Sequence, residues 1–203
     1  MPISFPVSVS TKKISSGPNK KIYYPQVYGT YMQSYINQTI VQKTQELIDK
    51  QVGDMPTTVE EMLGSYEIKN NQRDILSLSL SNYTYHYHAA HGMTYINSLT
   101  FDLQKGKLCD LKDLFKQNSN YIERISSLIK EQIQKRNIFL LEEFTSINPN
   151  QDFYIADKVL VVYFQLYELT AYAFGFPMFP LSVYDLQDII DEEGPLGRMA
   201  QNN

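Results

Sequence analysis

Residues 75–103 carry the alternation that most constrains how this chain can fold. Leucines occupy the even positions from 76 to 80 with serines between them, and this two-residue period predicts a β-strand with two distinct faces. From position 83 to 87 the large residues, all tyrosines, occupy odd positions instead. We therefore expect a bulge or strong bend near Ser81 and Asn82 that returns both sets to one face. With or without it, His86 and His88 lie on the face opposite the tyrosines.

The three histidines of the chain fall within six positions, as His86, His88 and His91. The first two point the same way from a strand, and the third, from the following loop, could complete a facial set of ligands. Three neutral imidazoles with an open position suit zinc, which activates a bound water. A metal-dependent hydrolase built on these histidines is therefore the alternative function. We favour a structure without metal or other cofactor, in which His91 and Gly92 form a tight corner and the imidazole holds the backbone.

Two segments change to the three- and four-residue period of an amphipathic helix, residues 29–51 and 119–136. Residues 3–9 and 20–24 alternate around a Ser-Gly-Pro-Asn turn, which predicts a β-hairpin. The fold class expected from these patterns is α+β: an antiparallel sheet with the two long helices packed on it, plus a small N-terminal lobe of hairpin and first helix. The polar tail at residues 191–203 is expected to be disordered.

Local signals predict several turns and caps. Gly106 is available for positive φ in a tight turn, and Asp110 with Asp113 resembles a capping box. Residues 156–158 are expected to turn a hairpin whose second strand, apolar and β-branched, is central. Ser182 is expected to cap a final helix that runs to residue 190.

The segment from 167 to 180 is unusually rich in large apolar side chains for a loop that Gly175 and two prolines interrupt. These groups either pack beneath the sheet, which we favour, or form an exposed patch for a partner. They are Tyr167, Tyr172, Phe174, Phe176, Met178 and Phe179. Glu168 lies among them, and we expect its carboxylate to hold the loop backbone by hydrogen bonds.

Charge and composition exclude some classes of function. Residues 1–50 carry six basic against two acidic side chains (+4), residues 51–136 carry ten of each, and residues 137–203 carry two against ten (−8). No basic stripe accompanies a reading element for DNA or RNA, so we expect no nucleic-acid partner. The first residues lack the charged and apolar regions of a signal peptide, and the longest apolar run is too short to span a membrane. The sequence carries no signal for an oligomeric state.

Several phrases of the sequence resemble the DUF3298 family. They are the leucine–tyrosine strand with Ala-His-Gly at 90–92, Phe-Asp-Leu at 101–103, Gly-Lys at 106–107, Leu-Lys-Asp-Leu-Phe at 111–115, Phe-Tyr-Ile at 153–155, Tyr-Glu-Leu-Thr-Ala-Tyr-Ala-Phe-Gly at 167–175 and Pro-Leu-Ser at 180–182. Residues 76–190 resemble the DUF3298 domain, and residues 1–75 resemble its usual N-terminal companion, DUF4163. The pair occurs in RsiV-like ectodomains of lysozyme-sensing anti-sigma factors and ahead of the catalytic domain in PdaC-type peptidoglycan deacetylases.

The resemblance implies a non-enzymatic binding or sensing module of the bacterial cell envelope, with a lysozyme-like protein or a cell-wall glycan as its partner. It implies an extracytoplasmic location, whereas the N-terminus without a signal peptide indicates the cytoplasm. The candidate ligand-binding residues are Tyr83, Tyr85, Tyr87, His86, His88, Tyr172 and Phe176. The residues expected to serve the structure of the motif are His91, Gly92, Asp102, Gly106, Asp113, Glu168 and Gly175. We expect no catalytic residue.

Overall fold

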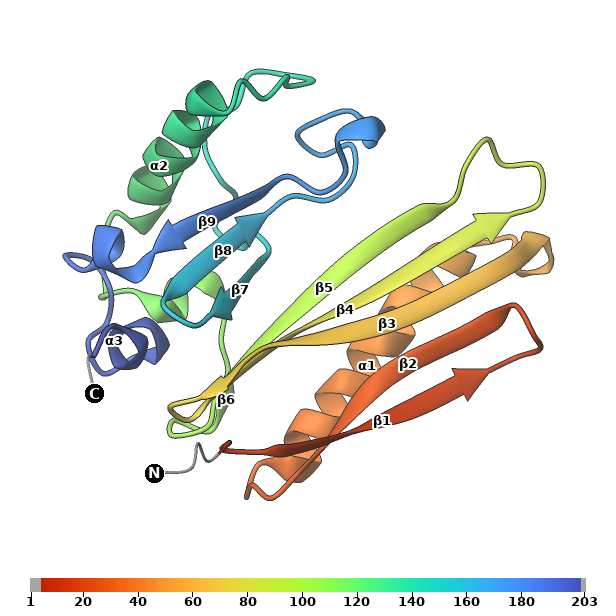
Figure 1. Cartoon of the computed structure of the whole chain (residues 1–203), viewed down its shortest axis with the longest axis horizontal. Helices are drawn as coiled ribbons and strands as arrows, with labels where there is room; N and C mark the ends of the chain where they lie inside the picture. The colour runs from red at the N-terminus through yellow and green to blue at the C-terminus, as the bar shows by residue number, and fades with distance from the viewer. Residues whose placement is uncertain (1–4, 202–203) are drawn as a thin grey trace.

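The computed structural model describes residues 5–201, which form an α+β fold with two β-sheets (Figure 1). The larger sheet has six strands in the order β1-β2-β3-β4-β5-β6, and the smaller has three, β7-β8-β9. The strands are β1 (Ser8–Ser15), β2 (Lys20–Tyr28), β3 (Val59–Gln72), β4 (Ile75–His86), β5 (Met93–Asp102), β6 (Lys107–Leu108), β7 (Phe153–Ala156), β8 (Val159–Tyr163) and β9 (Met178–Ser182). The helices are α1 (Gln33–Val52), α2 (Tyr121–Lys135) and α3 (Pro195–Ala200), with 3₁₀ turns η1 (Pro56–Thr58), η2 (Leu111–Leu114), η3 (Tyr172–Phe174) and η4 (Val183–Leu186).

The larger sheet is mixed, so our expectation of an antiparallel sheet was wrong in one pair of strands. β2 and β3 run parallel, with Lys20 opposite Met62 and Ile22 opposite Gly64. The other neighbouring strands of this sheet are antiparallel. The reason is α1, which connects β2 to β3: a helix of 20 residues carries the chain back along the sheet, so that β3 starts at the same end as β2.

The predicted N-terminal hairpin is present as β1 and β2, and it belongs to the same sheet as β3 to β6. Its first strand begins at Ser8, later than the alternation at residues 3–9 indicated, and residues 3 and 4 lie outside the described part of the chain. α1 covers one face of this sheet (Figure 1), where Ile36 and Ile40 are fully buried in one core with Leu76 and Leu78 of β4. Burying an apolar side chain of this size stabilises a fold by roughly 1.5–3 kcal/mol.

The second long helix packs on the smaller sheet, not on the larger one as we expected. Ile125 and Ile129 of α2 are buried in a core with Leu160 of β8 and Phe179 of β9. Figure 1 shows α2 beside β9, on the far side of the smaller sheet from the larger sheet. The helical period predicted the apolar face of α2, but it contained no information about which sheet would cover that face.

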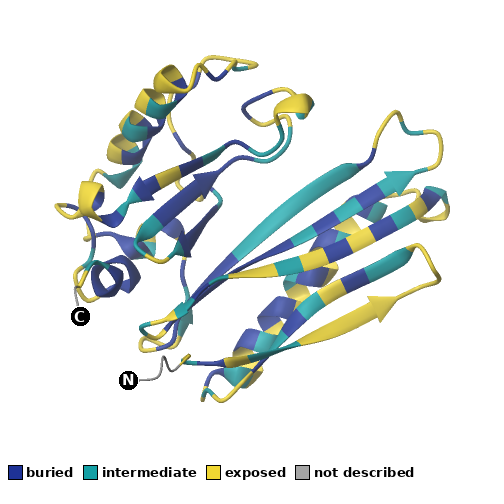
Figure 2. Ribbon diagram, viewed as in Figure 1, coloured by how far each residue is buried: buried dark blue, intermediate teal, exposed yellow. Residues whose placement is uncertain are grey.

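β4 is regular where we expected a bulge. Ser81 pairs with Ser65 and Asn82 pairs with Gly64 in unbroken register, and both irregularities of this strand pair lie on β3, near its two ends. The leucines therefore face α1 and the tyrosines face the other side of the sheet. Both faces of β4 are covered along its first half, so the leucines and the tyrosines do not have to share one face. Figure 2 shows this half of β4 as largely buried.

The serines of β4 face the smaller sheet and bond to it. The hydroxyl oxygen of Ser77 accepts a hydrogen bond from the backbone N–H of Ile155 at 3.0 Å and lies 2.8 Å from the hydroxyl of Thr100. In the neighbouring strand, the hydroxyl of Ser98 lies 2.9 Å from that of Tyr163. Small side chains let the two sheets approach closely, and the hydrogen bonds offset the cost of burying these polar groups.

Residues 191–201 are ordered, which corrects the expectation of a disordered tail for the described part of that segment. α3 buries Leu196 and Met199 in the core of the smaller sheet. Arg198 forms a buried ion pair with Asp102 of β5, with 2.8 Å between Nη2 and Oδ1. Pro195, which suggested an irregular tail, occupies the first turn of α3, a position that a helix accepts because the missing N–H has no partner there.

Several local predictions are confirmed. Asp110 and Asp113 form a reciprocal capping box around η2. β7 and β8 form the predicted hairpin, and β8 is the central strand of the smaller sheet. Ser182 accepts a hydrogen bond from the backbone N–H of Tyr184 at 3.3 Å, although the helix that it caps is the short turn η4, which ends before residue 190.

Candidate functional site

Four aromatic rings from separate parts of the chain meet beyond the β4–β5 hairpin. Tyr83 comes from β4, His91 from the loop after it, and Tyr167 and Tyr172 from the segment between β8 and β9. The ring centroids of His91 and Tyr172 are stacked 4.1 Å apart, and those of Tyr167 and Tyr172 are 5.6 Å apart. We call these four residues the tyrosine–histidine cluster. It joins the larger sheet to the longest loop of the smaller one.

A chain of hydrogen bonds fixes the rings of this cluster. The carbonyl of Gly92 can only accept, so Nδ1 of His91 donates to it at 2.9 Å, and the hydroxyl of Tyr172 donates to the same carbonyl at 3.0 Å. In the neutral imidazole, Nε2 is then an acceptor for the hydroxyl of Tyr167, 3.1 Å away. One backbone carbonyl therefore sets the orientation of both His91 and Tyr172.

Only glycine fits at position 92, because the ring of Tyr83 occupies the space that a side chain would need. A Cβ atom built on Gly92 would lie 2.2–2.3 Å from three atoms of Tyr83, which is far inside any real contact. The Ala-His-Gly corner and the tyrosine strand therefore require one another.

Tyr167 adopts a backbone conformation that a bulky side chain rarely accepts, with φ of 66°. Glu168 holds it there: its carboxylate accepts a hydrogen bond from the backbone N–H of Gln165 at 2.7 Å, and its own N–H donates to the carbonyl of Gln165 at 3.1 Å. A residue held in this region costs roughly 1–3 kcal/mol and is found most often at functional sites. Glu168 thus acts as the positioning residue for Tyr167, whose side chain is 46% exposed.

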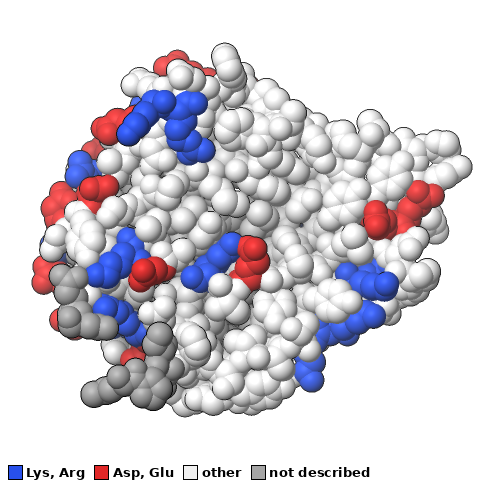
Figure 3. Space-filling view, viewed as in Figure 1, with Lys and Arg blue, Asp and Glu red and all other residues white. Residues whose placement is uncertain are grey.

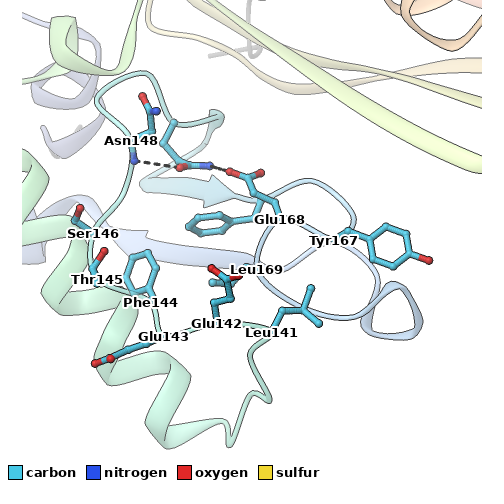
Figure 4. A pocket seen from close by; sticks show the side chains of 12 residues that line it. Leu141, Glu142, Glu143, Phe144, Thr145, Ser146, Asn148, Tyr167, Glu168 and Leu169 are labelled. Atoms are coloured by element: carbon cyan, nitrogen blue, oxygen red, sulfur yellow. Dashed lines mark hydrogen bonds between the residues drawn. The ribbon is translucent and has the colours of Figure 1, made fainter. Parts of the chain in front are cut away.

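A pocket of about 490 Å³ lies on the other side of the turn at 165–168 (Figure 4). Its lining includes Phe144, Phe164 and the exposed acidic residues Glu142 and Glu143. The carboxylate of Glu168 accepts a hydrogen bond from the Gln151 amide at 3.2 Å. The ring of Tyr167 points out of the pocket in Figure 4. The pocket is therefore polar and acidic, and its central carboxylate is already hydrogen-bonded within the protein.

Two ionisable groups, Tyr83 in the cluster and Cys109 elsewhere in the fold, have raised pKa values. Burial raises the pKa of Tyr83, and the nearby carboxylate of Glu61 raises it further, so its hydroxyl stays protonated at neutral pH. Elsewhere in the fold, burial raises the pKa of the Cys109 thiol to about 11, which leaves little reactive thiolate. The cluster offers ring faces and neutral hydroxyl groups to a ligand.

The three histidines are not brought together. Nε2 of His86 lies 2.7 Å from the carbonyl of Gln51 and Nδ1 lies 2.7 Å from the hydroxyl of Thr58, so the ring ties the end of α1 to β4. His88 lies past the strand end with φ of 62° and packs on the ring of Tyr87. Within residues 5–201 no group of three or more His, Cys, Asp or Glu side chains is placed to hold a metal ion. The geometry therefore gives no support to the alternative of a histidine-based metal hydrolase.

The other candidate ligand-binding residues surround the cluster or lie beyond it. Tyr85 is half-buried and follows Tyr83 on the same face of β4. Tyr87 is 59% exposed at the end of the β4–β5 hairpin. Phe176 is half-buried in the loop before β9. The apolar loop is thus divided, because Phe179 is fully buried whereas Phe174 is 46% exposed.

The remaining motif residues serve turns and connections. Asp102 is fully buried, and besides the ion pair its carboxylate accepts from the backbone N–H groups of Gln104 and Lys105 at 3.0 and 3.1 Å. Gly106 and Gly175 both adopt positive φ, in the turn after β5 and at the end of η3. Asp113 pairs with a lysine, Lys107, at 2.9 Å.

Our sequence analysis did not identify the glutamine side chains whose hydrogen bonds hold the backbone around the site. The side-chain amide of Gln165 bonds both the N–H and the carbonyl of Ile96 in β5, at 3.1 and 2.7 Å, and so extends the sheet edge. Gln151 likewise donates to the carbonyl of Tyr163 at 2.9 Å. A lone glutamine gives no periodic signal, so such contacts are visible only in the folded chain.

Comparison with known proteins finds one family model that matches part of the chain and two solved structures with a similar fold. Residues 112–184 match the model of the family described as "Protein of unknown function (DUF3298)". The fold is similar to the crystal structure of a DUF3298 family member from Bacteroides fragilis, with a TM-score of 0.71 and 12% identity over 98% of this chain and 99% of the other. A DUF3298 family protein from Pseudomonas aeruginosa is also similar, with a TM-score of 0.71 and 11% identity over 98% of each chain. The search of curated proteins found no match.

No helix within residues 5–201 is both long and apolar enough to cross a membrane.

Proposed function

Because residues 112–184 match the model of the DUF3298 family, we propose that this chain is a non-enzymatic binding module that recognises a component of the bacterial cell envelope through its tyrosine–histidine cluster. The observation that carries the proposal is the strained backbone of Tyr167, which the carboxylate of Glu168 holds so that the ring contacts His91. The Tyr167 ring contacts His91 and Tyr172, but it is 46% exposed and belongs to none of the buried apolar cores of the described residues. The conformation is therefore better explained by recognition than by stability.

The composition of the cluster supports a binding role. Tyrosine presents a large, rigid and amphipathic surface at a low cost in side-chain entropy, and tyrosines are enriched among the residues that dominate binding energy. The rings of Tyr167 and Tyr172 are held by hydrogen bonds before any ligand arrives, which lowers the entropy lost on binding.

We further propose that the ligand is a lysozyme-like protein or a cell-wall glycan, and that the protein works outside the cytoplasm. These proposals rest on the resemblance of residues 1–75 to DUF4163 and of residues 76–190 to DUF3298. Flat aromatic faces with polar tips suit either ligand. The two ligands are distinguished by experiment.

The test measures binding of the full chain to lysozyme and, separately, to soluble peptidoglycan fragments by isothermal titration calorimetry. We expect one of the two to bind, and we expect Tyr167→Ala and Tyr172→Ala each to weaken that binding by at least about tenfold, as for residues at the centre of an interface. Tyr184→Ala is the matched control, because Tyr184 is 47% exposed, against 46% for Tyr167, and lies at η4, outside the cluster. It should change affinity by less than about twofold.

Circular dichroism and thermal melting of each variant establish that the fold is intact. If both ligands fail to bind, or if the bound ligand has the same affinity for the two cluster variants as for the parent protein, the proposal is wrong.

A further inference from the structure

A second hollow, of about 310 Å³, lies on the opposite face of the larger sheet from the tyrosine–histidine cluster. It is enclosed by the β1–β2 hairpin, the second half of α1 and the start of β3. Its apolar walls are Ile14, Ile22, Ile48, Val52, Val59 and Met62. The polar side chains that border it are Ser16, Lys20 and Gln45.

The walls of this hollow form a small cluster separate from the main cores. Ile22, Val59 and Met62 are buried, and Ile48 and Val52 are partly buried against them. Ile22 lies beside Gly64 of β3, and a Cβ atom built on Gly64 would come within 2.4 Å of the Ile22 side chain. This wall of the hollow is therefore tightly packed. The space in front of it would hold about ten water molecules at about 30 Å³ each. Apolar walls give water few hydrogen-bonding partners, so an apolar group would displace water from this space favourably.

One charged side chain, Lys20 of β2, lines the hollow, and no acidic side chain does. Asp54, Glu60 and Glu61 lie near it in the sequence, after α1 and at the start of β3, but outside its lining. Figure 3 views the larger sheet from the side away from α1, so the Lys side chains that it shows over the hairpin at the lower right lie on the opposite face from the hollow. The two acidic residues of α1 are already engaged, since Glu46 pairs with Lys43 at 2.7 Å and Asp49 accepts from the Gln45 amide at 2.8 Å. Among residues 5–201, Lys20 makes no ion pair.

We propose that this hollow binds the alkyl chain of a free, single-chain anionic amphiphile, such as a medium-chain fatty carboxylate, and that Lys20 at its border contacts the anionic head. The volume suits a chain of about ten non-hydrogen atoms. Each methylene that enters an apolar site strengthens binding by about fourfold, so chain length should control affinity. The site is independent of the cluster and of the function proposed for it.

The first test titrates the full chain with octanoate, decanoate and decanol below their micelle concentrations, followed by calorimetry. Decanoate should bind with one-to-one stoichiometry and more than about tenfold more tightly than octanoate. Val52→Trp fills the hollow and should abolish binding. Val41→Trp is the control, since Val41 lies on the same helix, is 49% exposed and is outside the hollow, and it should bind decanoate as the parent protein does.

The second test separates the head from the chain. Lys20→Gln should weaken decanoate binding by at least about fivefold and leave decanol unchanged, whereas Lys21→Gln, at the next position of β2, should change neither by more than about twofold. The proposal is overturned if no chain binds, if Val52→Trp binds decanoate as tightly as the parent, or if Lys20→Gln affects the alcohol and the acid equally. It is also overturned if vesicles containing phosphatidylglycerol bind and free decanoate does not, because the ligand would then be a membrane lipid.

Discussion

Gly92 and Tyr83 form the contact on which the tyrosine–histidine cluster depends most directly. We expect Gly92→Ala to destabilise the protein by roughly 1–3 kcal/mol, because the added methyl group must displace the Tyr83 ring that lies 2.2 Å from its position. Urea unfolding measures the change. In a Tyr83→Ala background the same substitution should cost much less, since the ring is gone. An equal cost in both backgrounds would show that the close approach does not control this corner.

The histidines show why residue spacing alone is not enough to identify a metal site. His86 is the last residue of β4, and His88 lies two residues on, where the positive φ has already turned the chain. Their rings therefore point into different surroundings, although an uninterrupted strand would have placed them side by side. The turn depends on how the hairpin closes, which the H-x-H pattern does not specify.

At the scale of elements, α3 is held to the larger sheet by the buried ion pair of Arg198 with Asp102 and by hydrogen bonds to Arg73 in the β3–β4 turn. Arg198→Met removes the partner of a fully buried carboxylate, Asp102, and we expect it to destabilise the protein by roughly 3–5 kcal/mol. Lys105→Met is the matched control, because it removes an exposed ion pair to Asp191 of similar length, 2.9 Å, and should cost no more than about 1 kcal/mol. Chemical unfolding of both variants gives the comparison. Equal losses for the two would mean that burial adds nothing to the Asp102 pair.

Some features of the elements follow from the local sequence pattern, and others depend on tertiary contacts. The apolar period of α1 and α2 and the capping box at η2 follow from neighbouring residues, and all three were predicted. The bulge in β4 was predicted wrongly, because the leucines and the tyrosines do not share one face of the strand. The smaller sheet covers the serine face of β4. The pattern of leucines and serines gives no sign that a second sheet packs there.

At the scale of the whole molecule, the boundary between the two family-like regions falls between paired strands. β3 ends at Gln72 and pairs along nearly its whole length with β4, which begins at Ile75, the last residue of the first region. The face of α1 is likewise buried against Leu76 and Leu78. We therefore expect a fragment of residues 1–75 to be unfolded alone and to regain structure when mixed with residues 76–203, as followed by circular dichroism and NMR dispersion. A folded fragment 1–75 would instead establish an independent N-terminal domain.

Periodicity and short motifs were enough to predict the α+β class, the positions of the long helices, the β7–β8 hairpin and the resemblance to the DUF3298 family, whose model matches residues 112–184. The parallel pairing of β2 with β3, the packing of α2 on the smaller sheet and the docked helix at residues 195–200 became visible only in the folded chain. It alone brought Tyr83, His91, Tyr167 and Tyr172 together. These outcomes depend on contacts between residues far apart in the chain, such as Arg198 with Asp102, and local periodicity contains no information about such partners.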